Sequence, residues 1–481
     1  MKHTFHPDFI KRYEGLFSEK EFSDFLQSCQ TPLRKAIRIN TLKISEKDFL
    51  KRAKANNWQL TKIAYVDQGY FIDRDDTSIP LWKSIEYFAG LFYIQETSSM
   101  IPPVLLKNLD KQSIILDVSA APGSKTTQIA NYKNNEWLII GNDIVAQRLK
   151  ALKTNINYQG FYNCASSKLD GRDFGRYFKE TFDAILLDAP CSGEWTMRKS
   201  EVKWSIEVIH DLAKLQKKLI LSAIEALKVW GTLVYSTCTM TPEEDEAVLS
   251  YAKEALWDAI EIVSWTLPWL NSTTWVTHWQ WSDYQKEVQN SQKIWPHIND
   301  TEGFFISKII KKSPTNIYES LPYYQAKKDE VILKGKELKA LYSQVSKRFW
   351  IDKNVFSDKH IVKKWNELEI RTKQAKQFSN YAMIQNMGIP LGTIIDNIFS
   401  FSFYAAQVFW EKASKNYIEL QTPEEAENFR IWKDIKLTVH QCTESTPWQV
   451  IVRYDNIILG SSLLKKDLTL KNQVPRETIK I

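Results

Sequence analysis

Glycine is scarce in this chain of 481 residues, which contains 15 glycines but 18 tryptophans. Its five cysteines form neither a C-x-x-C pair nor a zinc-ligand spacing, which argues against a disulfide framework and a structural zinc site. No apolar run approaches the ~18 residues of a membrane span, and the N-terminus has no apolar signal segment. We therefore expect a cytoplasmic protein with no metal and no membrane partner.

The shortage of glycine is matched by the excess of tryptophan. Glycine makes up about 3% of the chain against about 7% in average proteins, and glycine plus tryptophan together reach about 7%. Trp82, Trp195 and Trp230 fall where a tight turn or the flanking motif favours glycine. We therefore hypothesise that these residues are glycines in the living protein, from UGA codons that mean glycine in its gene but were translated as tryptophan.

The length predicts about three domains. An N-terminal α+β domain is expected at 1–108, where two amphipathic helical patterns precede a short alternating strand and a further helix. A catalytic α/β domain is expected at 109–312. A polar linker with prolines then leads into a C-terminal region at 313–481, in which the pattern predicts an apolar helix near 395–410 and strands at 437–439 and 449–454.

The net charge of +7 is compatible with a phosphate-rich partner, although charge that serves only solubility explains it equally well. Four basic residues lie beside the strand expected at 36–40: Arg34, Lys35, Arg38 and Lys43. They would suit an RNA-contacting surface, and an edge strand guarded by lysines is the structural alternative.

In the central region, strands alternate with helices, which predicts a doubly wound, Rossmann-like sheet. The strands are expected at 114–118, 138–142, 184–188, 233–236 and 304–308. The first is followed by a turn of small residues at 119–125 and then by a helix, the geometry that seats an adenosine cofactor at the carboxyl edge of a parallel sheet. The turn is not a phosphate-binding P-loop, because G-x-x-x-x-G-K-[ST] is absent.

Two cysteines follow strands of this sheet, Cys191 in Ala-Pro-Cys-Ser-Gly and Cys238 in Ser-Thr-Cys-Thr. A cysteine thiolate can attack C6 of a cytosine and make C5 nucleophilic enough to accept a methyl group, so that a methyl donor is required. From the spacing alone either cysteine is a candidate for the attack. Both could instead be core residues, the commonest fate of a free cysteine.

These segments, in this order, resemble the Nop2/Sun family of RNA cytosine-5 methyltransferases, which use S-adenosylmethionine. The resemblance covers roughly residues 30–310 and includes these segments: 32–41, 114–129, 141–144, 170–172, 187–193, 231–239, 295–297 and 302–305. The length, and a tail at 460–476 similar to a PUA-like RNA-binding domain, indicate the type that modifies small-subunit (16S) ribosomal RNA. Trp204 and Trp295 match tryptophans of the family, so the glycine hypothesis does not extend to them.

The resemblance assigns roles to the site residues. It implies that Cys238 is the nucleophile and that Cys191 resolves the adduct, while Asp188 hydrogen-bonds the N3 and N4 edge of cytosine and must hold or share a proton. It also implies a cofactor site made by the turn together with three carboxylates: Ser119, Ala120, Ala121, Pro122, Gly123, Ser124, Lys125, Asp143, Asp170 and Asp188.

Some of these residues also have structural interpretations. Asp143, about 20 residues after the glycine turn, would accept the ribose hydroxyls of the cofactor, or would cap the next helix; the family more often has glutamate there. Asp170 would contact the adenine amine or shape its pocket, or would form the turn before Gly171. Lys125 could steady a thiolate or a phosphate, and the pair at 198–199 could contact the RNA backbone, although exposed basic residues are usually only solvated.

The sequence therefore predicts S-adenosylmethionine-dependent methylation of C5 of a flipped-out cytosine in 16S ribosomal RNA, through a covalent adduct with C6. A transfer RNA methyltransferase of the same family is one alternative. A catalytically inactive RNA-binding factor for ribosome assembly is another, provided that Trp195 and Trp230 are real and block the pocket.

Overall fold

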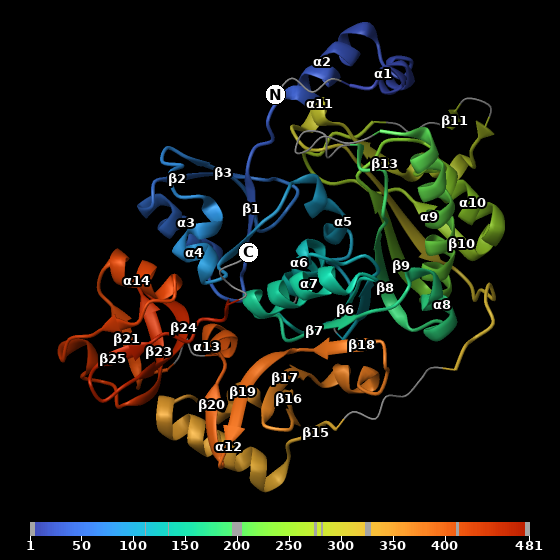
Figure 1. Cartoon of the computed structure of the whole chain (residues 1–481). Coiled ribbons are helices and arrows are strands. Elements are labelled where there is room, and N and C mark those ends of the chain that lie inside the picture. The colour runs from blue at the N-terminus through green and yellow to red at the C-terminus, as the bar shows by residue number, and fades with distance from the viewer. Residues whose placement is uncertain are drawn as a thin grey trace.

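A sheet of nine strands forms the centre of the molecule, with strand order β10-β14-β9-β8-β5-β6-β7-β18 and β13 paired to β14 (Figure 1). The computed structural model describes residues 5–110, 112–132, 134–194, 204–273, 277–279, 282–322, 329–409 and 413–476. The sheet strands are β5 (Ile114–Asp117), β6 (Leu138–Asn142), β7 (Cys164–Ser167), β8 (Phe182–Asp188), β9 (Leu227–Thr237), β10 (Ile260–Val263), β13 (Gln292–Ile294), β14 (Phe304–Lys311) and β18 (Ile384–Met387).

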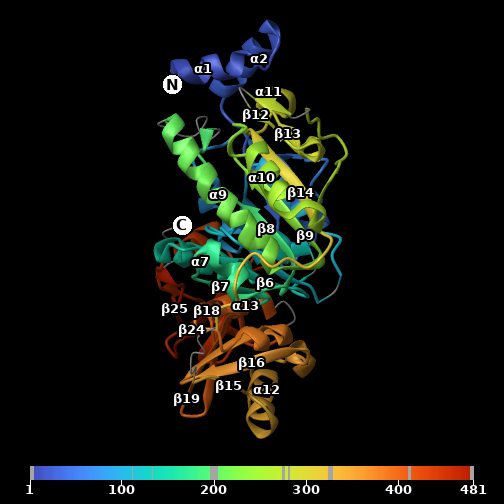
Figure 2. The same ribbon diagram turned by 90° about the vertical axis from the view of Figure 1, so that its right-hand side faces the viewer.

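The five strands β5 to β9 are parallel, and the others pair antiparallel at the two edges. Neighbouring residues of the buried strands face opposite sides, so that Ile115 packs in one hydrophobic core and Leu116 in the other. Helices cover both faces, with α9 and α10 on the side seen in Figure 2. The helices of this part are α6 (Ser124–Tyr132), α7 (Ala146–Gln159), α8 (Phe174–Tyr177), α9 (Ile206–Ala226), α10 (Glu246–Leu256) and α11 (Pro296–Asn299). The predicted Rossmann-like α/β sheet is confirmed.

The N-terminal region contains an antiparallel sheet of order β2-β3-β1-β4. Its elements are α1 (Pro7–Glu14), α2 (Glu19–Gln30), β1 (Ala36–Ile39), α3 (Glu46–Ala55), β2 (Trp58–Lys62), β3 (Gly69–Arg74), the 3₁₀ turn η1 (Leu81–Lys83), α4 (Ile85–Phe88), β4 (Phe92–Ile94) and α5 (Ile101–Val104). The helices α1 and α2 lie apart from this sheet and pack on the part of the chain that contains the nine-stranded sheet, where Phe9 and Phe25 meet Met240 and Trp295 (Figure 1).

The C-terminal region forms two five-stranded sheets, of order β15-β16-β17-β19-β20 and β21-β23-β24-β25-β22. Its elements are β15 (Val331–Ile332), α12 (Gly335–Phe349), β16 (Lys359–Lys364), β17 (Glu367–Thr372), β19 (Ile389–Ile395), β20 (Ile398–Phe401), α13 (Phe403–Phe409), β21 (Tyr417–Leu420), α14 (Pro423–Arg430), β22 (Ile435–Lys436), β23 (Trp448–Tyr454), β24 (Ile457–Leu464) and β25 (Thr469–Lys471). Between β17 and β19 of the first of these sheets, the chain contributes β18 to the nine-stranded sheet, beside β7. The helix predicted near 395–410 is therefore wrong in its first half, where β19 and β20 form a hairpin.

Two of the four basic residues proposed for RNA contact bind groups inside the protein: Arg38 is buried and Lys43 is partly buried. The Arg38 guanidinium is fully enclosed and donates to Thr127 Oγ1 at 2.9 Å and to Gln95 Oε1 at 3.1 Å. The Lys43 ammonium donates to the carbonyl oxygens of Ala89 and Tyr158, at 2.9 and 2.7 Å. It also donates to Gln407 Oε1 of α13, at 2.8 Å. The RNA-contact prediction is wrong for both, because these cations join the N-terminal sheet to α6, α7 and α13.

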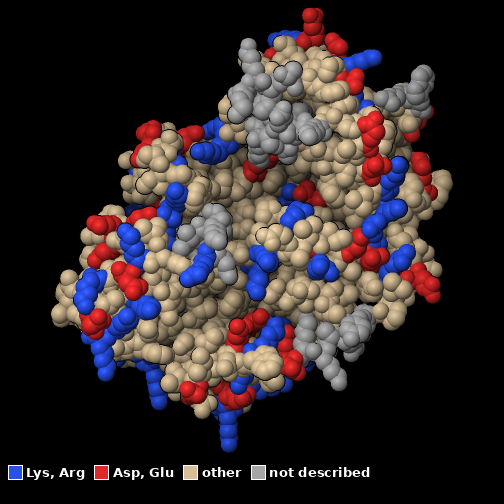
Figure 3. Space-filling model, in the orientation of Figure 1, with Lys and Arg blue, Asp and Glu red and all other residues tan. Residues whose placement is uncertain are grey.

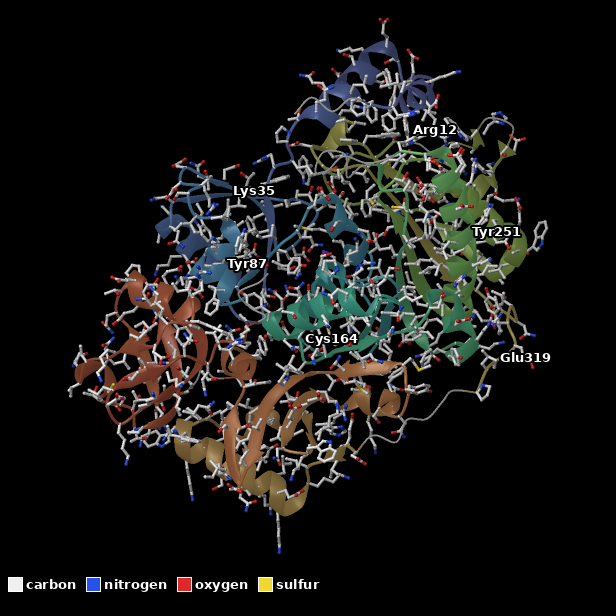
Figure 4. The ribbon with its side chains drawn as sticks, in the orientation of Figure 1. Arg12, Lys35, Tyr87, Cys164, Tyr251 and Glu319 are labelled. Carbon is white, nitrogen blue, oxygen red and sulfur yellow. The ribbon has the colours of Figure 1, made fainter. Side chains whose placement is uncertain are left out.

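The other two basic residues of that group, Arg34 and Lys35, are exposed, and Lys35 is labelled in Figure 4. For them the RNA contact stays a prediction. On the face seen in Figure 3, basic side chains alternate with acidic ones, so this face has no single field of one sign. In the described parts of the chain, no helix is both long and apolar enough to cross a bilayer.

Candidate active site

The turn after β5 is held in place by α7. Gly123 has φ +110°, a conformation that favours glycine, and a Cβ there would lie 2.9 Å from the end of the Leu152 side chain. Arg148 Nη2 donates to the Ala121 carbonyl at 2.7 Å, and Asn155 Nδ2 donates to the Pro122 carbonyl at 2.9 Å. The backbone of the turn is thus presented in a fixed shape at the carboxyl edge of the sheet.

Asn142 ties together the segments that follow three neighbouring strands. Its amide nitrogen donates to the carbonyls of Val118 and Leu169, at 3.0 and 2.9 Å, and its oxygen accepts from Ser167 Oγ and the Leu169 amide. All four bonding positions of the buried amide are satisfied. Sequence reasoning passed over this residue, although an asparagine at the end of a buried strand is a signal for such a clamp.

Two buried carboxylates at this edge each keep one oxygen without a hydrogen bond in the described structure. Asp143 Oδ1 accepts from the Val145 amide at 2.9 Å, whereas Oδ2 has only the ion pair with Arg148, at 3.1 Å but without hydrogen-bond alignment. Asp117 Oδ2 accepts from Thr126 Oγ1 at 2.7 Å, and its Oδ1 has no partner. Buried polar atoms normally find partners, so both oxygens fit a ligand that carries hydroxyl or amine donors, as an adenosine does.

Asp117 was not among the predicted site residues, although an acidic residue that ends the first strand of such a sheet could have indicated it. Burial raises the pKa of this carboxyl to about 7, more than the hydrogen bond from Thr126 lowers it.

Asp170 takes the structural role that the sequence left open. It precedes the 3₁₀ turn at 171–173, and its Oδ1 accepts from the Arg172 amide at 3.0 Å. The Arg172 guanidinium also binds both carboxylate oxygens, at 2.9 and 2.5 Å, and these hydrogen bonds lower the pKa of Asp170. Both oxygens are therefore engaged, and an adenine amine would have to share them or displace Arg172.

Asp188, the last residue of β8, lies at the centre of the site. Its Oδ2 accepts from Lys125 Nζ at 2.6 Å, and its Oδ1 accepts from Ser236 Oγ at 2.7 Å, its partner in register on β9. Burial by itself would lower the pKa of Lys125, but the attraction of Asp188 outweighs it and raises that pKa. This ammonium is also close enough to interact with Cys238.

The two predicted cysteines meet above this carboxylate, because β8 and β9 are adjacent parallel strands that end at the same edge. Cys191 Sγ and Cys238 Sγ are 3.2 Å apart, and both side chains are only half-buried. The hydrogen bond to Cys238, with burial, raises the pKa of Cys191 well above its usual value. In contrast, Cys29 and Cys164 are buried in hydrophobic cores, and Cys164 is labelled in Figure 4.

The buried carboxylate of Glu194 links the two cysteine loops to the N-terminal helix α1. Glu194 accepts from Tyr13 Oη, Trp204 Nε1 and Thr239 Oγ1, at 2.5, 2.6 and 2.9 Å. The helix α1 therefore reaches the two cysteine loops directly.

Three residues singled out in the sequence lie outside the described part of the chain: Trp195, Arg198 and Lys199.

Two protein families match the chain. The family described as 16S rRNA methyltransferase RsmB/F matches residues 103–310, and the N-terminal domain of 16S rRNA methyltransferase RsmF matches residues 5–97. The ribosomal RNA small subunit methyltransferase F of Vibrio parahaemolyticus is 34% identical over 489 residues, which covers 98% of each chain. The protein of the same name from Vibrio atlanticus is 43% identical over 309 residues, 63% of each chain.

Solved structures agree with this result. A methyltransferase homolog protein from Pyrococcus horikoshii superposes with a TM-score of 0.55 at 30% identity, covering 64% of this chain and 100% of that chain. NSun6 from Pyrococcus horikoshii, with a TM-score of 0.56 at 22% identity over 64% of this chain and 99% of its own, shares the fold. Together with the full-length relatives, these matches show that the chain belongs to the RsmF family of 16S ribosomal RNA methyltransferases.

Proposed function

We propose that this enzyme methylates C5 of a cytosine in 16S ribosomal RNA, with Cys238 as the nucleophile and Cys191 as the group that helps to release it. The observation that carries the proposal is the 3.2 Å contact between the two sulfur atoms beside the Lys125–Asp188 pair. S-Adenosylmethionine is the methyl donor that the family and the fold imply.

The chain's own residues would act in a defined order. With a flipped-out cytosine in the site, the Cys238 thiolate bonds to C6 while a proton held between Asp188 and the base goes to N3, so that electron density moves to C5. A bound donor supplies the methyl group as an electrophile. Loss of the C5 proton to a base, the role we give to the Cys191 thiolate, then re-forms the C5–C6 double bond and expels the Cys238 thiolate, while N3 returns its proton to Asp188.

The proposed cofactor site consists of the backbone from Ser119 to Lys125 together with Asp143. Glycine at 123 and the carbonyl bonds from α7 fix the turn, and Asp143 Oδ2 is the buried acceptor for a ribose hydroxyl. Asp170 supports the edge of the pocket through its turn. Asp117 joins this set through its own unpartnered oxygen.

The rival functions lack support of this kind. The relatives that match the whole chain carry names that refer to small-subunit ribosomal RNA, which favours that substrate over transfer RNA. An inactive assembly factor required a blocked pocket, but Trp230 is 66% exposed and lies roughly 20 Å from the carboxyl end of β9, at ~3.3 Å per residue.

The test uses the full chain, tritiated S-adenosylmethionine and, in parallel, 16S ribosomal RNA, 30S subunits and total transfer RNA. We expect methylation of a ribosomal cytosine, mapped by bisulfite sequencing. Cys238→Ala should abolish it while leaving donor affinity within a few-fold, because the thiol contacts the base and not the adenosine. Turnover retained in Cys238→Ala would assign the attack to Cys191, and methylation of transfer RNA alone would refute the ribosomal substrate.

Cys191→Ala tests the second role. This variant should form the covalent bond but resolve it slowly, so that a denaturing gel shows an RNA–protein band that the Cys191→Ala/Cys238→Ala double variant lacks. Normal turnover without a trapped band would mean that Cys191 is structural.

A further inference from the structure

Tryptophan divides into two populations in this structure. Of the 18 tryptophans, Trp195, Trp275, Trp281 and Trp410 lie outside the described residues, and half of the others have a positive φ. Those seven are Trp230, Trp257, Trp269, Trp350, Trp365, Trp432 and Trp448, with φ between 44° and 118°. Only a few per cent of non-glycine residues adopt this region, and bulky side chains are outliers there. None of the described phenylalanines and tyrosines does so.

The surroundings of the two populations differ as well. Apart from Trp432, the residues with positive φ are 46% to 85% exposed. In contrast, three of the described tryptophans outside that group, Trp137, Trp265 and Trp295, have negative φ and are at most 8% exposed, and Trp137 Nε1 donates to the Asp110 carbonyl at 2.7 Å. A large aromatic residue normally buries its surface, and these three do so.

Three of the seven occupy positions that backbone chemistry reserves for glycine. Trp350 is the C-terminal cap of α12, with φ 55° and ψ 43°, and its amide donates to the Ser346 carbonyl. The corresponding cap of α7 is Gly160, also left-handed. Trp269 follows Pro268 in a turn closed by the bond from the Leu270 amide to the Leu267 carbonyl, the third position of a type II turn.

The third of these, Trp365, starts the two-residue turn between β16 and β17, where φ is positive at the first residue only, as in a type II′ turn that calls for glycine. The other two-residue hairpins of this region use Asp-Asn, at 396–397 and 455–456, with both residues at positive φ. Asparagine and aspartate tolerate that conformation, and tryptophan does not.

We propose that the natural protein carries glycine at all seven positions, because its gene has UGA codons there that its own cells translate as glycine. The buried tryptophans are genuine and are encoded by UGG. For two of the residues first suspected, the structure adds different information. Trp230 belongs to the seven, whereas Trp82 lies in the 3₁₀ turn η1 with an ordinary backbone, so its identity rests on the codon alone.

The direct test is mass spectrometry of tryptic peptides from the protein isolated from its own cells, with the gene sequence beside it. We expect glycine masses and UGA codons at the seven positions, and tryptophan masses and UGG codons at 137, 265 and 295. Tryptophan masses at the seven positions, or UGG codons there, would overturn the proposal.

A second test compares recombinant proteins. A chain with glycine at the seven positions should denature at a higher temperature than the chain as printed, because the backbone strain is removed where little side-chain packing is lost. The matched control places glycine at the three buried positions and should fail to fold or melt much lower. A seven-glycine chain that melts below the printed chain would contradict the assignment.

A different observation carries a second inference, which rests on the proposed function. The residues on both sides of Cys191 are held by one buried pair, Glu244 and Gln216. Glu244 Oε1 accepts from the Ser192 amide at 3.0 Å and from Gln216 Nε2 at 2.9 Å, and its Oε2 accepts from Ser192 Oγ at 2.5 Å. Gln216 Nε2 also donates to the Pro190 carbonyl at 2.9 Å.

The same pair is tied to the second cysteine. The Glu244 carbonyl accepts from Tyr235 Oη at 2.6 Å, on the strand that ends before Cys238. Ser192 Oγ also lies 3.3 Å from Thr239 Oγ1, which follows Cys238. The cysteine loops are thus joined on both sides of the sulfur contact.

We infer that Glu244 is a positioning residue, which keeps Cys191 Sγ within reach of Cys238 and of the C5 proton. Glu244→Ala should then form the RNA adduct at nearly the normal rate but release it at least ten-fold more slowly, as Cys191→Ala does. Glu244→Gln keeps an oxygen for the Ser192 amide and should restore release.

The trapped RNA–protein adduct of the cysteine variants is the control. If Cys191→Ala traps no RNA, or if the Cys191→Ala/Cys238→Ala double variant still forms a band, the proposed roles of the two cysteines fail. If those variants behave as expected but Glu244→Ala releases RNA normally, only the positioning role is refuted. Equal slowing of adduct formation and release in Glu244→Ala, unrelieved by Glu244→Gln, would indicate general misfolding and would also refute it.

Discussion

Replacement of Asp188 by asparagine separates the catalytic from the structural role of the central carboxylate. Breaking a buried ion pair by removing one partner costs about 3–5 kcal/mol. Here the Asp188 side chain is 27% exposed, and asparagine keeps an oxygen that can accept from Lys125 or Ser236, so we expect about 1–2 kcal/mol. The melting temperature should fall by only a few degrees.

The catalytic effect of Asp188→Asn should be much larger. Asparagine cannot pass a proton to N3 of the base, and loss of such a group costs about 10²–10⁴-fold in rate, or ~3–5 kcal/mol in the barrier. The assay is single-turnover transfer of tritiated methyl groups to 16S ribosomal RNA. Ser236→Ala is the matched control, because it removes one hydrogen bond to the same carboxylate, worth about 1 kcal/mol, and should stay active. A rate for Asp188→Asn within ten-fold of the parent would refute the reasoning.

Three further changes have defined outcomes. Arg38→Met removes the buried fork that binds Thr127 and Gln95, so urea denaturation should show a loss of about 2–4 kcal/mol, and Arg38→Lys should not restore it. Asp143→Ala should weaken S-adenosylmethionine binding about 10–100-fold by calorimetry, while adduct formation with RNA persists. Asp117, with its pKa raised to about 7, holds a proton that the unfolded chain releases above about 4; stability should therefore fall as the pH rises from about 4 to 7, and Asp117→Asn should flatten that part of the profile.

The sequence was sufficient for the catalytic sheet and for the meeting of the cysteines. Long buried strands such as β6 and β8 read as continuous apolar runs, and the ends of adjacent parallel strands must meet at one edge, which brings Cys191 and Cys238 together. The strand β18 was missed because its pairing with β7 joins residues more than 200 positions apart. No local pattern records such a partner.

The basic residues near β1 show a second limit. Arg38 and Lys43 are residue types typical of a solvated or RNA-binding surface. Their partners, however, are hydroxyl, carbonyl and amide groups of α6, α7 and α13, which only the folded chain brings near. Burial of a cation that is fully hydrogen-bonded is allowed physically and invisible in a local pattern. Asp170 shows the converse, because its local turn with Arg172 explains both of its oxygens without a ligand.

Conflicts between local preference and fold usually mark functional or strained sites, where the surrounding structure compensates for the strain. The seven tryptophans with positive φ do not fit that rule. Trp269, Trp350 and Trp365 stand in turns and caps and are at least 60% exposed, so that little burial compensates a bulky left-handed residue. The backbone conformation of these turns suits the other residues in them and conflicts only with tryptophan. The simplest physical solution is therefore a different amino acid, and glycine is the one that removes the conflict at all seven positions.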